Sequence, residues 1–116
     1  MKYLCLAYGD ETEWNTLSKG EQDALLAQDE VLRRRGDLVA AVEPASTVVR
    51  AANGTPQTTE GPFGASFLPL AGFGIIEAAS LDEAVKLVAK TPCARAGGAV
   101  ELRPILASND AGRPRA

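Results

Sequence analysis

The fold of this chain is decided by residues 59–77, which read TEGPFGASFLPLAGFGIIE. The segment Glu60–Phe63 favours a rigid turn, because its glycine accepts backbone angles that other residues avoid and its proline fixes φ. The run Gly72–Glu77 is apolar at nearly every position, which is typical of a strand covered on both faces. We therefore predict a fixed turn that leads through an apolar loop into a central strand.

A hairpin is predicted immediately before this turn. Thr47–Arg50 is a β-branched run, Asn53-Gly54 is a strong hairpin-turn signal, and Thr55–Thr59 is the return arm. Pro56 lies inside the return arm and has no backbone N–H to donate. This arm should therefore lie at a sheet edge or be irregular.

The chain before the hairpin reads as strand, helix and strand. Lys2–Tyr8 is apolar on both alternating sides, and Leu38–Val42 is a second short apolar run. Between them, Ser18–Glu21 fits a capping box at a helix start and Gly36 suits the left-handed position after a helix end. The predicted apolar stripe of this helix consists of Ala24, Ala27, Val31 and Leu32, widened by Leu25.

The chain after the hairpin repeats the same order. The central strand Gly72–Ala79 leads into a second capping pattern, Ser80–Glu83, and Pro92 prevents that helix from continuing. Ala99–Leu106 alternates apolar and charged residues and is the last predicted strand, with Pro104 placing it partly at an edge or bulge.

These elements predict an α+β fold of the ferredoxin-like, split βαβ type, with an antiparallel sheet and two helices on one face. We expect a single domain over residues 1–106 and a mobile tail over residues 107–116, which has nothing to bury. Because both faces of the central strands are apolar, the uncovered face needs a partner. The simplest partner is a second copy, so we predict a homodimer through sheet faces.

Composition limits the possible functions. The 116 residues carry a net charge of −3, and the pI is about 4.9, so nothing indicates a nucleic-acid partner. The basic cluster Arg33–Arg35 falls at a predicted helix end, where cations complement the helix dipole. No apolar run is long enough for a membrane span, and the opening run does not fit a signal peptide, so we expect a cytoplasmic protein without a membrane partner.

The sequence contains no histidine, which removes the commonest general base and the commonest zinc ligand. Cys5 and Cys93 lack CxxC spacing, so we expect two free thiols rather than a disulfide. Cys5 is a poor candidate for a nucleophile, because no neighbouring base is predicted that could remove the proton from its thiol. No acidic cluster has metal-loop spacing, and we predict neither a metal nor a cofactor.

The chain resembles the YCII-related superfamily, and more closely its DGPF branch, over roughly residues 1–106. The resemblance lies in the opening Lys2–Asp10 with Trp14, the turn Glu60–Phe63, Gly72-Phe73, the segment Glu77–Glu83 and the closing Val100–Pro104. It implies a ferredoxin-like fold that dimerises through its sheets, a dimeric α/β-barrel. It implies little about activity: most members are of unknown function, and a few relatives are thought to be enzymes with a His–Asp pair in a cleft.

Two departures from the family pattern matter. Glu60 stands where the family motif has aspartate, and residues 64–70 are apolar where the family has a polar stretch. The absence of histidine excludes the His–Asp pair.

Charged residues on strands otherwise committed to burial are the candidate site groups, because a buried charge is costly unless it is paired. We predict that Glu77 and Arg103 line one polar cleft beside the Glu60–Phe63 turn. There Arg103 would hold a small anionic molecule and a carboxylate would act as base. The alternative is a purely structural ion pair. The catalytic candidates are Glu77, Glu60 and Asp10, and the candidate ligand-binding residues are Tyr8, Asp10, Glu60, Phe63, Glu77 and Arg103.

Three functions are compatible with this sequence. The favoured one is a dimeric small-molecule-binding or regulatory accessory protein without catalysis. The second is an enzyme that uses carboxylate acid–base chemistry on a small acidic or carbonyl substrate. The third is a protein-interaction module that uses the apolar loop Phe67–Leu70. Trp14 could stack on a ligand or cap the core.

Overall fold

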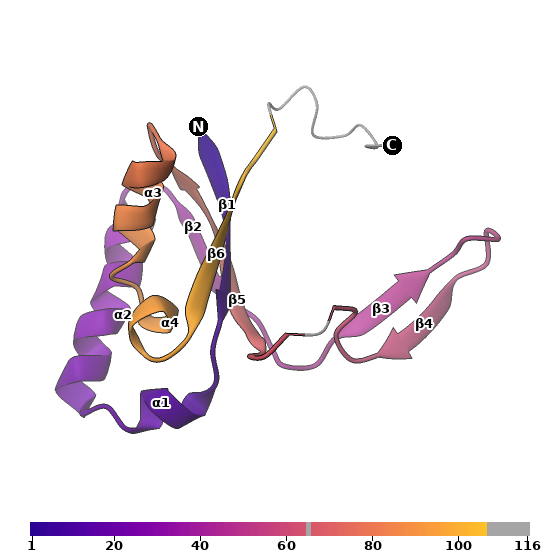
Figure 1. The fold of residues 1–116 in the computed structure, drawn as a ribbon, viewed down its shortest axis with the longest axis horizontal. Coiled ribbons are helices and arrows are strands. Elements are labelled where there is room, and N and C mark those ends of the chain that lie inside the picture. Colours follow the sequence, from indigo (N-terminus) through magenta and orange to yellow (C-terminus); the bar gives the residue numbers. More distant parts are fainter. Residues whose placement is uncertain (65, 107–116) are drawn as a thin grey trace.

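The computed structural model describes residues 1–64 and 66–106, so the predicted tail over residues 107–116 lies outside the described residues. The core is an antiparallel sheet of four strands in the order β2-β5-β1-β6 (Figure 1). The strands are β1 Lys2–Tyr8, β2 Leu38–Ala41, β5 Leu70–Glu77 and β6 Ala99–Pro104. This order, with a helix crossing in each half, is the ferredoxin-like arrangement and confirms the predicted α+β fold.

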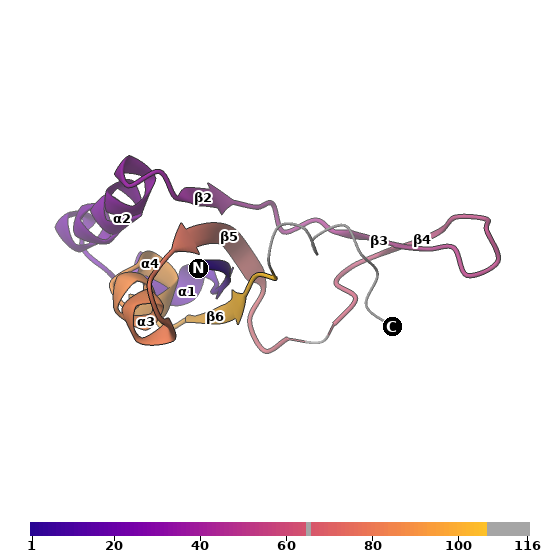
Figure 2. The same cartoon turned by 90° about the horizontal axis from the view of Figure 1, so that it is seen from above.

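The helices cover one face of this sheet (Figures 1 and 2). They are α1 Glu11–Asn15, α2 Lys19–Arg34, α3 Leu81–Val88 and α4 Pro92–Arg95. The two long predicted helices are α2 and α3, whereas α1 and α4 were not predicted. Pro92 does more than end a helix: it occupies the first turn of α4, where its missing N–H costs nothing.

The predicted ends of α2 are confirmed. The Ser18 hydroxyl accepts from the Glu21 N–H at 3.1 Å, and the Glu21 carboxylate accepts from the Ser18 N–H at 2.9 Å. The hydrogen bond from the Ser18 N–H to this carboxylate, with a further contribution from the Ser18 side chain, holds the pKa of Glu21 below its ordinary value. Gly36, with φ of 96°, follows the last turn in the left-handed conformation that a side chain resists.

The predicted apolar stripe of α2 is wrong in part. Ala24, Ala27 and Val31 are exposed, and only Leu32 of the predicted stripe is buried. The helix instead turns Leu25, Asp29 and Leu32 inward, a spacing of four and three residues that places them on one side. A charged residue therefore lies within the inward-facing stripe.

The core is small and lies between the sheet and the helices. Tyr3 and Cys5 of β1 and Ile76 of β5 point to the helix face, where they pack with Leu32, Ala78, Ala84 and Val88. Strand pairing places Tyr3 opposite Ile76 and Cys5 opposite Gly74, so these side chains share one face.

The other face of the sheet has no helix over it (Figure 2). It carries the alternate side chains of the same strands. Leu4 pairs with Ile75 and Leu6 with Phe73, and all four are half-buried. Leu38 of β2, opposite Ile75, is 46% exposed on the same face. Both faces of the central strands are thus apolar, as the sequence predicts.

The predicted hairpin forms a separate two-stranded arm that projects away from the sheet (Figure 1). It consists of β3 Thr47–Arg50 and β4 Gln57–Glu60, and β4 begins directly after Pro56. Every residue of the arm strands except Val48 is exposed. The projection raises the radius of gyration to 16.2 Å, against about 13 Å for a compact chain of similar length.

Replacing Ser18 with Ala tests the cap of α2. Ser18→Ala removes the acceptor for the Glu21 N–H and should lower the free energy of unfolding by about 1 kcal/mol. Urea denaturation measures this loss. Ser46→Ala, in the exposed loop before β3, is the control and should change stability by no more than a few tenths of a kcal/mol. Equal effects of the two changes would contradict the role of the cap.

Candidate functional site

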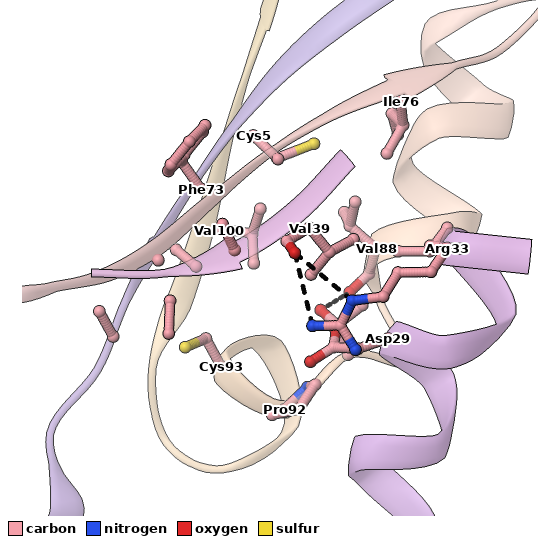
Figure 3. Close-up of a pocket in the computed structure, with 18 of the residues that line it drawn as sticks. Cys5, Asp29, Arg33, Val39, Phe73, Ile76, Val88, Pro92, Cys93 and Val100 are labelled. Atoms are coloured by element: carbon pink, nitrogen blue, oxygen red, sulfur yellow. Dashed lines mark hydrogen bonds between the residues drawn. The ribbon is translucent and has the colours of Figure 1, made fainter. Parts of the chain in front are cut away.

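A cavity of about 240 Å³ lies between α2 and the helix face of the sheet (Figure 3). Its floor is formed by β1, β2 and β5, and its far wall by α4 and Val100 of β6. Most of the lining is apolar. The charged side chains among the lining residues are Asp29 and Arg33, both from α2.

The cavity exists because the floor carries very small side chains. Gly72 and Gly74 of β5 face α2, beside Ala7 of β1 and Ala41 of β2. A Cβ atom on either glycine would lie 2.7 Å from a carbonyl oxygen of β2, so the close approach of β2 requires glycine there. No side chain from these two positions can fill the space beneath α2.

A wider mouth of about 700 Å³ continues the cavity toward solvent. The two spaces share Leu26 and Asp29 of α2, Ala41, Ala71 and Cys93, so they form one cleft. Part of the wall of this mouth is formed by helix α1, which was not predicted. The residues that line it there are Glu11 and Trp14 of the helix and its N-cap residue, Asp10.

Asp29 lies where the inner cavity meets the mouth, and it is half-buried. Burial raises the pKa of its carboxyl group, while Arg33 lowers it and Glu30 raises it further. Its carboxylate accepts no hydrogen bond from the described residues, in contrast to Asp10, which accepts from the Thr12 N–H at 3.0 Å as the cap of α1. Asp29 is therefore a carboxyl group free to meet a ligand.

The side-chain nitrogens of Arg33 make hydrogen bonds to groups other than the Asp29 carboxylate. Its Nε and Nη2 lie 3.4 Å from the Val39 carbonyl oxygen (Figure 3), and Nη1 donates to the Glu30 carboxylate. These contacts connect the end of α2 to β2 along the cavity rim. The guanidinium is thus a structural tie at the edge of the cleft.

Both cysteines line the inner cavity (Figure 3). They are free, as predicted. Burial, with a contribution from Asp37, raises the pKa of Cys5 to about 11. Burial, with a contribution from Asp29, also raises the pKa of Cys93. Both groups are protonated thiols at neutral pH and therefore poor nucleophiles.

The predicted partnership of Glu77 and Arg103 is not formed. The Glu77 carboxylate lies 3.0 Å from the Met1 ammonium and is 61% exposed. Arg103 pairs with Glu101 on the same strand at 3.0 Å. The reason is register: Glu77 pairs with Lys2, whereas Arg103 pairs with Leu4 on the other side of β1, so each charge finds a nearer partner.

The end of β5 that carries Glu77 is instead a structural junction. The Glu77 N–H donates to Asp37 at 3.0 Å, and the Glu77 carbonyl accepts from Arg35 at 2.6 Å. Arg35 also lies 3.4 Å from the second oxygen of the nearly buried Asp37 carboxylate. These contacts fasten the C-terminal end of α2 to the sheet.

The other predicted site residues are dispersed. Glu60 ends β4 on the projecting arm and is exposed, and Phe63 is 74% exposed with the Arg50 guanidinium 5.2 Å from its ring centroid. Tyr8 ends β1, between Leu70 and Ala99. Of the six predicted ligand-binding residues, Asp10 alone is among those that line the cleft.

The sequence reasoning missed Asp29. The signal was present in the spacing Leu25, Asp29, Leu32, an acid in line with two apolar residues on α2. The competing stripe through Ala24, Ala27 and Val31 concealed it. Trp14 was noted as a possible stacking residue, and it does line the mouth of the cleft.

The fold and cleft define a ferredoxin-like α+β protein with a small cavity under its first long helix. The family model of the YCII-related domain matches residues 1–109, and the chain belongs to this family. The match is compatible with the DGPF branch without singling it out. No curated protein matches the chain.

Among solved structures, the chain is similar to 5-chloro-2-hydroxyhydroquinone dehydrochlorinase (TftG) from Burkholderia phenoliruptrix AC1100, in complex with 2,5-dihydroxybenzoquinone. The identity is 20%, the TM-score is 0.49, and the match covers 94% of this chain and 97% of that chain. Within the described residues, no helix is both long and apolar enough to cross a membrane.

Replacing Asp29 with Asn tests the cost of the buried carboxylate. A folded pKa above the ordinary value of 3.8 means that the ionised carboxylate destabilises the fold above the folded pKa, and that this cost vanishes below 3.8. Asp29→Asn should therefore raise the free energy of unfolding at pH 7 by less than about 1 kcal/mol, since the group is only half-buried. The gain should disappear in acid.

Urea denaturation across pH measures this difference. Asp23→Asn is the control, because Asp23 lies on the outer side of α2 and pairs with Lys19 in solvent. It should bring no gain at pH 7. A less stable Asp29→Asn variant at pH 7 would mean that attraction to Arg33 outweighs the cost of burial.

Proposed function

We propose that this YCII-related protein binds a small, largely apolar molecule in the cleft beneath α2, without catalysis. The observation that carries the proposal is the position of Asp29, an acid without a hydrogen-bond partner among the described residues, in a cavity with apolar walls. Small-molecule sites are mostly apolar with a few placed polar groups, and this cleft has that composition.

The size of the inner cavity supports a compact ligand. An apolar protein cavity of about 150 Å³ is large enough for benzene. A space of about 240 Å³ accommodates a ring with a short substituent, with the mouth available for a longer one. Removing such a molecule from water contributes about 25 cal/mol per Å² of apolar surface.

The raised pKa of Asp29 favours a second candidate, an enzyme that uses carboxylate acid–base chemistry. In that case Asp29 would be the base, in place of Glu77 or Glu60, which lie outside the cleft lining, while Asp10 would stand at the entrance. An enzyme would convert its bound ligand to a product and would lose this activity in the Asp29→Asn variant, whereas a binding protein would leave the ligand unchanged.

We also propose a homodimer, with the uncovered sheet face as its interface. The half-buried Leu4, Leu6, Phe73 and Ile75 supply an apolar surface, and the exposed, mostly polar projecting arm offers a further contact. A two-stranded hairpin is marginal in water unless something packs against it. The fully exposed Phe67 lies in the loop after the arm, and in a homodimer it would pack against the second copy together with the arm.

A contact of the Phe67–Leu70 loop with a different protein is the alternative use of this surface. The two free thiols fit a reducing compartment, and we propose a cytoplasmic location.

Filling the cavity tests the binding proposal. Ala41→Leu adds a side chain where the inner cavity meets the mouth. A ligand found in a thermal-shift screen of small aromatic alcohols and amines should bind this variant at least about tenfold more weakly, a loss of about 1.4 kcal/mol. Isothermal titration calorimetry measures the affinity.

Ala24→Leu, on the exposed side of α2, is the matched control and should bind normally. Unchanged affinity in Ala41→Leu would place the ligand elsewhere and refute the cleft.

Placing a charge on the uncovered face tests the homodimer. Ile75→Lys puts an ammonium group between the apolar Leu4 and Leu38 of that face and should convert a dimer into a monomer, because an unpaired charge is costly to bury. Light scattering in dilute solution measures the mass. Val85→Lys, at a 48% exposed position on α3, should remain dimeric. A parent protein that is already monomeric would overturn the proposal.

A further inference from the structure

We infer that the cleft selects a small organic cation, an amine carried on an apolar body, with its ammonium group at Asp29. This inference rests on the proposed binding function and adds the chemical class of the ligand. It stands on the charges along the cleft, on the hydrogen bonds already made there and on the apolar character of the inner walls.

The mouth of the cleft is lined by acids and not by bases. Asp10, Glu11 and Asp29 line it, and neither Lys nor Arg is among its described lining residues. Asp10 is fixed as the cap of α1 through one carboxylate oxygen. A cation approaching through this mouth is attracted at every stage, and an anion is repelled.

Arg33 does not reverse this selection. It is the cation of the inner lining, but its Nε, Nη1 and Nη2 are directed to the Val39 carbonyl and the Glu30 carboxylate. An anionic ligand would have to compete with these contacts. Asp29, by contrast, makes no side-chain hydrogen bond within the described part of the chain, so an ammonium group would find an acceptor without displacing one.

The walls around Asp29 make such a pair effective. Leu26, Ala41, Ala71 and Pro92 surround the junction where Asp29 lies, and few polar atoms compete for the ligand. A partly desolvated carboxylate gains more from a cation than an exposed one does. Trp14, in the wall of the mouth, offers an aromatic surface that also favours cations. The small anionic ligand expected at Arg103 is therefore replaced by a cation at Asp29.

Three probes of one shape and different charge test the inference: 2-phenylethylamine, 2-phenylethanol and phenylacetate. Calorimetry on the full chain at neutral pH should give an affinity for the amine at least about tenfold above that for the alcohol, as expected for a charge-assisted hydrogen bond, and the weakest binding for phenylacetate. Asp29→Asn should remove the advantage of the amine and leave the alcohol within about threefold. Asp23→Asn, on the same helix outside the cleft, should retain it.

The outcomes separate the two proposals. Binding of the alcohol or of phenylacetate as tightly as the amine, and weakened by Ala41→Leu, would overturn the cation and keep the binding function. An amine preference that survives Asp29→Asn would also overturn the inference. Absence of binding by all three probes would refute the inferred preference for a cation. Absence from the wider screen of any ligand whose binding is weakened by Ala41→Leu would refute the proposed binding function of the cleft.

Discussion

The close approach of β2 to β5 is the constraint on which the cleft depends. Carbonyl oxygens of β2 lie where side chains of Gly72 and Gly74 would begin, so β5 must present bare backbone toward α2. A well-packed interior would fill that space with side chains from the strands. Here the helix spans a floor of glycine and alanine, and the gap between them remains open as a cavity.

The position of α2 over that floor explains why an acid can occupy its inner side. Leu32 is buried against the core, whereas Asp29, nearer the N-terminal end of α2, is half-buried beside the opening. A fully buried carboxylate would need a cation or several hydrogen bonds. Half-burial beside a mouth makes the cost smaller, and the raised pKa of Asp29 records what remains of it. The half-buried carboxylate therefore lowers the stability of the fold and leaves a polar group available in the cleft.

The sequence predicted the fold because each signal was local and the signals agreed. The capping box at Ser18, the turn at Gly36 and the two-faced apolar strands each depend on a few neighbouring residues. The site was less predictable because it depends on register and on which side of a helix faces inward. An ion pair between Glu77 and Arg103 is predicted because each is a charge on an otherwise apolar strand. The two residues lie on strands on opposite sides of β1, and each has a nearer partner. The inward side of α2 was misjudged because Ala24, Ala27 and Val31 formed a more apolar stripe than the one that contains Asp29.

The arm is inserted between β2 and β5, so the segment that projects outward is separate from the strands that form the sheet and the cavity. The entropy lost in closing a loop grows only with the logarithm of its length, so doubling the connection between these strands costs only about 0.6 kcal/mol. The β2–β5 ladder is formed by residues outside the arm, with its register set by Leu38 opposite Ile75 and Ala41 opposite Gly72. The arm within this connection can therefore be shortened, extended or replaced by another hairpin while the sheet and the inner cavity beneath α2 keep their geometry, provided that Val42, Pro44 and Pro69, which line the mouth, are kept. Evolution, or a designer grafting a new segment at this point, can alter what the molecule touches without altering what its interior holds.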